Sequence, residues 1–133
     1  MKMFLFGFMA IVLMSCLHMY RPPEFLGSPS RLYKLTATIN EDVNKSKWEC
    51  VVLTLYDSSY RKINTLQTGA SNNMKWAADW YKGRDTIILN SKDIGVYAWR
   101  ISNKKTLTLI SVTNDIEVQA NLIFERKYAS QNN

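Results

Sequence analysis

The stretch Trp48-Glu49-Cys50-Val51-Val52-Leu53-Thr54-Leu55-Tyr56 decides the fold expected for this chain. From Val51 to Leu55 apolar residues occupy both faces of an extended segment. A strand that is apolar on both faces is typical of the interior of a sheet, where neighbours cover it. We therefore expect residues 48–56 to form a central strand, with the free thiol of Cys50 buried in it as a small hydrophobic group.

The segments around this strand show patterns of the same kind. Residues 31–40 alternate strictly between apolar and polar side chains, which predicts a half-buried strand. Further short strands are expected at 60–66, 74–81, 85–90, 96–101 and 106–112, with turns such as Asp57-Ser58-Ser59 between them. Their spacing of roughly ten residues predicts an antiparallel β-meander of about six or seven strands.

The last segment changes to a helical period. Its apolar residues follow the spacing of one helix face: Ile116, Ala120, Ile123 and Phe124. Asp115 and Glu117 favour the first turn of a helix, because negative charge is stabilised near a helix N-terminus. We expect a helix over 115–128 packed on the sheet, with 129–133 fraying. The predicted fold class is α+β, mainly β.

The N-terminal segment has the pattern of a targeting signal. Lys2 precedes an apolar run from Phe4 to Met14, which is within the roughly 7–15 residues of a secretory h-region. The run ends in Leu13-Met14-Ser15-Cys16 and is too short for a membrane span of about 20 residues. This segment resembles the lipobox-type signal peptide of small Gram-negative lipoproteins, an otherwise uncharacterised group. The alternative is an ordinary cleaved signal peptide, in which Cys16 is incidental.

The resemblance implies three parts of the chain. Residues 1–15 would be a lipoprotein signal peptide, residues 16–30 a lipidated tether stiffened by prolines, and residues 31–133 a single β-rich globular domain. Cys16 would carry a diacylglyceryl group and commonly a further acyl chain such as palmitate. Because Leu17 is not the aspartate that retains such proteins in the inner membrane, we expect the bacterial outer membrane, facing the periplasm. Inner-membrane sorting stays open.

Composition limits the chemistry of the predicted domain. The formal net charge is +6, but the basic residues are scattered, whereas nucleic-acid binding favours a clustered stripe. The lone histidine, His18, lies in the predicted tether, so a histidine-based catalytic triad is not expected. No Cys/His cluster suited to zinc occurs, and we expect no metal and no cofactor.

Side chains at the predicted turns are the candidate binding residues, because binding residues gather on loops held by a rigid scaffold. The candidates are Tyr60, Arg61, Lys82, Arg84, Lys92 and Asp93. Trp76, Trp80 and Trp99 could belong either to the core or to a binding face. Asp79 and Asp85 flank a predicted hairpin turn, and paired carboxylates are the groups that glycoside hydrolysis uses.

These observations favour a non-enzymatic, membrane-anchored envelope lipoprotein that acts as a binding module. Its partners would be the membrane, through the N-terminal lipid, and a protein or cell-wall component, with no nucleic acid. One version is an immunity-type inhibitor of a periplasmic toxin, in which case the positive charge favours an acidic toxin. The alternatives are a cell-wall hydrolase that uses Asp79 and Asp85, or a purely structural envelope component. The sequence leaves the oligomeric state open.

Overall fold

The computed structural model describes residues 23–40 and 49–129. Within these ranges it contains eight strands and one helix: β1 (Leu26–Gly27), β2 (Tyr33–Ile39), β3 (Cys50–Asp57), β4 (Lys62–Ser71), β5 (Trp76–Trp80), β6 (Thr86–Ser91), β7 (Gly95–Ile101), β8 (Leu107–Ile110) and α1 (Asn114–Ala129). The predicted signal peptide, Cys16, His18 and Trp48 lie outside the described residues. No helix in the described ranges has the length and apolar character needed to cross a membrane.

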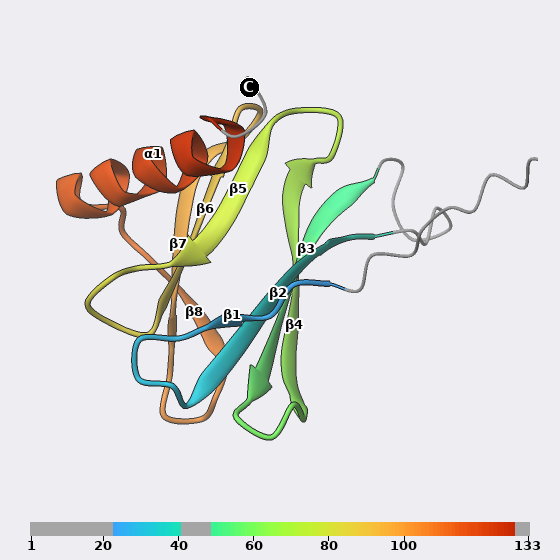
Figure 1. Ribbon diagram of the computed structural model, residues 1–133, viewed down its shortest axis with the longest axis vertical. Coiled ribbons are helices and arrows are strands. Elements are labelled where there is room, and N and C mark those ends of the chain that lie inside the picture. The colour runs from blue at the N-terminus through green and yellow to red at the C-terminus, as the bar shows by residue number, and fades with distance from the viewer. Residues whose placement is uncertain (1–22, 41–48, 130–133) are drawn as a thin grey trace, which may run out of the picture.

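The strands form two antiparallel sheets and not one. Sheet A has the order β1-β2-β3-β4 and sheet B the order β5-β6-β7-β8, with every neighbouring pair antiparallel. Figure 1 shows three layers, in which sheet A, sheet B and α1 follow one another. The expected single meander of six or seven strands is therefore corrected to two sheets with eight strands in the described residues. The mainly β class, the antiparallel pairing and the C-terminal helix are confirmed.

The main core lies between the two sheets. Val51, Leu53 and Leu55 of β3 are fully buried and face this core, together with Ile87 and Leu89 of β6. Side chains alternate along a strand, so each sheet can present one apolar face to the other. The central position predicted for the β3 segment is confirmed, since β3 pairs with both β2 and β4. Cys50 is buried and free, as expected.

The helix covers the other face of sheet B. Ile116, Ala120 and Ile123 are buried in a second core with Ile88 and Ala98 of the sheet. The Thr113 hydroxyl accepts the backbone N–H of Ile116 at 3.4 Å, which is the bond made by an N-cap residue. The helix therefore begins where the sequence predicts it.

The N-terminal part of the described chain belongs to the fold. Leu26 and Gly27, which were expected in the tether, pair with Leu35 and Lys34 as strand β1. The indole N–H of Trp80 donates a hydrogen bond to the Leu26 carbonyl oxygen at 2.8 Å, which links β1 to sheet B. Strand β4 also ends later than predicted, because it continues past residue 66 to Ser71.

Candidate binding surfaces

The predicted binding residues lie on three turns, which do not form one site. Tyr60 and Arg61 belong to the β3–β4 turn, Lys82 and Arg84 to the β5–β6 turn, and Lys92 and Asp93 to the β6–β7 turn. The β5–β6 turn contacts the β1–β2 turn, whereas the β6–β7 turn contacts the far end of β4. Because adjacent antiparallel strands reverse direction, the first two turns lie at one end of the sheets and the third at the other.

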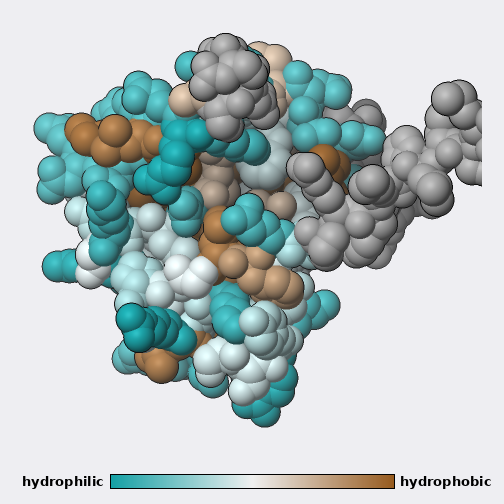
Figure 2. Space-filling view, in the orientation of Figure 1, coloured by the Kyte–Doolittle hydropathy of each residue, from teal (hydrophilic) through white to brown (hydrophobic). Residues whose placement is uncertain are grey.

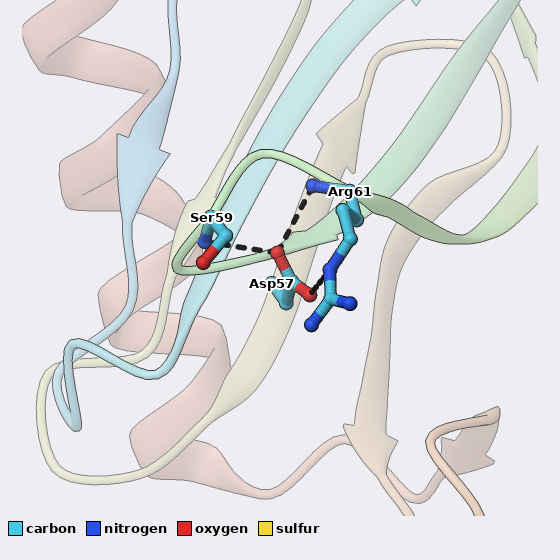
Figure 3. A network of polar contacts seen from close by, with 3 residues as sticks. All are labelled: Asp57, Ser59 and Arg61. Carbon is cyan, nitrogen blue, oxygen red and sulfur yellow. Dashed lines mark hydrogen bonds and ion pairs between the residues drawn. The ribbon is translucent and has the colours of Figure 1, made fainter.

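Arg61 stabilises its own turn. The Asp57 carboxylate accepts the backbone N–H groups of Ser59 and Arg61, both at 2.9 Å, and the Arg61 Nε–H at 2.8 Å (Figure 3). The backbone N–H of Arg61 is the main cause that lowers the pKa of Asp57 below its usual value. The Arg61 guanidinium forms an ion pair with this carboxylate, so its charge already has a partner within the turn.

The β6–β7 turn also has structural contacts. The Asp93 carboxylate accepts hydrogen bonds from the Ser91 hydroxyl and from the backbone N–H of Ser71. Gly95 has φ +87°, a value that glycine adopts without steric cost and that this turn requires. The Lys92 ammonium lies 4.9 Å from the centre of the Phe124 ring, close enough for a cation–π contact.

The two aspartates of the hydrolase hypothesis make separate contacts. Asp79 accepts the backbone N–H of Trp80 at 2.7 Å and lies 3.5 Å from the Arg126 guanidinium on α1. Asp85 accepts both the backbone N–H and the hydroxyl of Ser30, at 3.1 and 2.5 Å. These contacts direct one carboxylate to the helix and the other to sheet A, so they favour structural roles for both.

An aromatic cluster lies around Tyr60 on the outer face of sheet A. The Phe25 ring contacts the rings of Tyr56 and Tyr60 edge to face, each with a centroid distance of 5.1 Å. The Lys34 ammonium lies 3.2 Å from the centre of the Tyr60 ring. We call Phe25, Lys34, Tyr56 and Tyr60 the aromatic cluster. Among the described residues, α1 packs on sheet B, so no helix covers this face of sheet A (Figure 1).

Local sequence patterns do not indicate that Phe25 and Lys34 belong to this cluster. Phe25 lies in the segment predicted as tether, and Lys34 is a polar residue of an ordinary alternating strand. Only the β1–β2 and β2–β3 pairings bring them beside the β3–β4 turn. The alternation in 31–40 does place Lys34 on the wet face, but nothing local indicates its aromatic partner.

A groove of about 540 Å³ lies between β1, β5 and the last turns of α1. Its basic side chains already have partners, because Arg126 faces Asp79 and the Lys127 ammonium donates to the Trp76 carbonyl oxygen at 2.7 Å. The Lys127 ammonium also lies 3.4 Å from the centre of the Trp76 ring, and burial lowers the pKa of Lys127. These two basic side chains therefore attach the helix to β5.

The surface of α1 has a small hydrophobic area. Figure 2 shows hydrophobic surface over the helix, and Val118 and Leu122 are its exposed large hydrophobic residues. The described part of the chain contains no group of three or more potential metal ligands. No protein-family model matches the chain, and neither the curated proteins nor the solved structures contain a match.

Proposed function

We propose that this protein is a non-enzymatic binding module, anchored to the outer membrane by lipid on Cys16, and that the aromatic cluster is its contact surface. The supporting observation is that aromatic side chains of this cluster are exposed to solvent and are nevertheless held in place by their neighbours. Phe25 and Tyr60 are 41% and 57% exposed, yet each ring is held by another ring or by an ammonium group. Apolar side chains that are exposed next to one another, in contrast to single exposed ones, often mark a protein interaction site.

The chemistry of the cluster favours a protein partner. Tyrosine is enriched among the residues that dominate binding energy, because a large ring buries much area and loses little conformational freedom. The Lys34 ammonium adds positive charge at the centre of the surface, and the whole chain has a net charge of +6. The partner is therefore a protein with an acidic surface, for which an acidic periplasmic toxin is one version.

The proposed lipid anchor at Cys16 would hold the aromatic cluster close to the membrane. Phe25 lies nine positions after Cys16. Since an extended chain spans at most about 3.6 Å per residue, a lipid at Cys16 would hold the cluster within roughly 30 Å of the membrane. The module would then meet partners that are themselves at the envelope surface, at a high local concentration.

Crosslinking and pull-down from membranes test this proposal. The tagged wild-type chain is compared with Phe25→Ala and with Leu109→Ala, a matched control that truncates a residue of sheet B with 58% exposure. We expect Phe25→Ala to lose an acidic protein that both wild type and Leu109→Ala capture, and we expect added salt to weaken the capture. Equal capture by all three chains would show that the cluster is not the contact surface.

A further inference from the structure

Strand β5 is an edge strand of sheet B, and its residues 76–79 line the groove between β1 and the last turns of α1. In an antiparallel ladder, the backbone groups of successive residues point alternately toward and away from the neighbouring strand. The Lys75 carbonyl oxygen accepts the Lys92 N–H at 3.0 Å, and the Tyr81 N–H donates to the Thr86 carbonyl oxygen at 2.7 Å. Odd-numbered residues of this segment therefore point to β6, and even-numbered ones point away from it.

Contacts within the domain satisfy both ends of the free edge of β5. The Trp76 N–H donates to the Tyr128 hydroxyl at 2.9 Å, and the Trp76 carbonyl oxygen accepts from the same hydroxyl and from the Lys127 ammonium. At the other end, the Trp80 N–H donates to the Asp79 carboxylate at 2.7 Å. These backbone groups are therefore not available to another chain.

Ala78, between the two ends, keeps its outward N–H and C=O groups free. No hydrogen bond within the described ranges involves either group, although the residue is partly buried and lines the groove. Backbone groups that are withdrawn from water normally have partners, and a free strand edge offers them to another extended chain. The short side chains of Ala37 and Ala77, which also line the groove, leave the space beside Ala78 open.

We propose that this groove binds a short extended peptide segment of a partner protein, which pairs with Ala78 as an additional strand. The N–H and C=O groups of one peptide residue bond to those of Ala78, while β1 and α1 lie on either side of the peptide. In this mode of recognition main-chain bonds provide affinity and alternate side chains provide specificity. The volume of about 540 Å³ is within the range of roughly 300–1,000 Å³ that is typical of ligand sites.

The walls of the groove define the chemistry of the peptide. Ala37 and Ala77 leave room only for small apolar side chains. Glu24 lines the groove from the segment before β1, and no ion pair of the described residues involves it. The peptide therefore carries a lysine or arginine that faces Glu24. Because the edge lies between β1 and α1, it admits a single linear segment more readily than the edge of a second folded copy. This proposal depends neither on lipid at Cys16 nor on the aromatic cluster.

Selection from a displayed library of random hexapeptides tests the groove, with the full chain as the target. The selected peptides are synthesised and titrated, and amide NMR follows binding. We expect saturable shifts of the Ala77 and Ala78 signals, and selected sequences with small side chains and a lysine or arginine. Methylation of successive peptide amides should reduce affinity at alternate positions only, because alternate N–H groups of a paired strand face β5.

The variant Ala78→Pro removes the outward N–H and breaks no bond to β6. Proline is tolerated on an edge strand at such a position, so the fold should remain while peptide affinity falls at least about tenfold. Leu109→Pro is the matched control on edge strand β8. The bond from the Ser102 N–H to the Thr106 carbonyl oxygen sets the alternation there, and it directs the Leu109 N–H away from β7. This control should bind the peptides as the wild type does.

A second pair of variants tests the charge without changing the backbone. Glu24→Gln should weaken the selected basic peptides about threefold, whereas Glu117→Gln, on the exposed first turn of α1, should leave their affinity unchanged. If Ala78→Pro does not fold, this pair and the methylated peptides decide. The proposal is overturned if no selected peptide shifts Ala78, or if each variant binds like its control. Dimerisation of the wild type that Ala78→Pro abolishes would also overturn it, since a second copy would then occupy the edge.

Discussion

The carboxylate of Asp93 accepts the backbone N–H of Ser71 at 2.8 Å, which joins a turn of sheet B to the last residue of β4 in sheet A. At the opposite end of the sheets, the Asp85 carboxylate accepts the backbone N–H and the hydroxyl of Ser30. One aspartate therefore bridges the two sheets at each end.

The Asp93 bridge should make stability depend on acid pH. The Ser91 hydroxyl, followed by the Ser71 backbone N–H, lowers the pKa of Asp93 in the folded state. Its stabilisation is thus complete above the ordinary pKa of an aspartate and is lost as the pH falls through the lowered folded value. We expect Asp93→Asn to cost about 1 kcal/mol at pH 7, and less near pH 3, in urea unfolding. A cost that is equal at both pH values would contradict this account.

The backbone of Tyr60 is strained, whereas its ring makes favourable contacts. Its φ is +65°, in the left-handed region that costs an L residue roughly 1 kcal/mol. Tyr60→Gly relieves this strain but removes the ring from Phe25 and Lys34, so the free energy of unfolding should change by less than about 1 kcal/mol. Capture of the acidic partner should nevertheless be lost.

Lys105 provides the matched control for this change. It has φ +59° in the β7–β8 turn of sheet B, and it is not a member of the aromatic cluster. Lys105→Gly should raise the free energy of unfolding by up to about 1 kcal/mol and leave partner capture intact. Loss of capture in this variant would assign the effect to the glycine and not to the aromatic ring.

Two neighbouring residues of α1 should respond very differently to truncation. Ile123 is 6% exposed and packs in the second core, whereas Leu122 is 46% exposed. Ile123→Ala should lower the free energy of unfolding by about 2–4 kcal/mol, because it leaves a cavity between the helix and sheet B. Leu122→Ala should cost less than about 0.5 kcal/mol. Denaturant unfolding of both variants checks the packing of the helix, and equal costs would refute it.

Substitutions of the two cysteines should distinguish membrane anchoring, at Cys16, from core packing, at Cys50. Cys16→Ser should release the chain from the membrane fraction, since the acyl chains provide the proposed attachment. Cys50 is buried, so Cys50→Ser should lower thermal stability without changing membrane retention. Fractionation followed by immunoblotting measures membrane retention, and a thermal unfolding curve measures stability. Unchanged retention of Cys16→Ser would exclude lipid on this residue as the anchor.

Much of the secondary structure can be predicted from local patterns. The alternation in 31–40, the apolar run around Leu53 and the helical stripe through Ala120 each correspond to an element of the structure. Strand β1 could not be found in this way, because two residues are too few to show a period. The division into two sheets was also missed, since alternation shows which residues share a face but not which strands pair.

In the candidate sites, too, local patterns predicted some residues and missed others. Composition and turn position singled out Tyr60, and the structure places it in the aromatic cluster. Its partner Phe25 was not found, because Phe25 reaches Tyr60 only through the pairing of β1 with β2.

The sequence by itself determined where the chain is extended, where it turns and where the final helix begins. Each of these depends on side-chain period and on capping groups within a few residues. Only the tertiary structure decided that two sheets face each other and that Asp85 and Asp93 bridge them. These features depend on contacts between residues far apart in the chain, and such contacts form only when the buried faces of both sheets and the helix pack together.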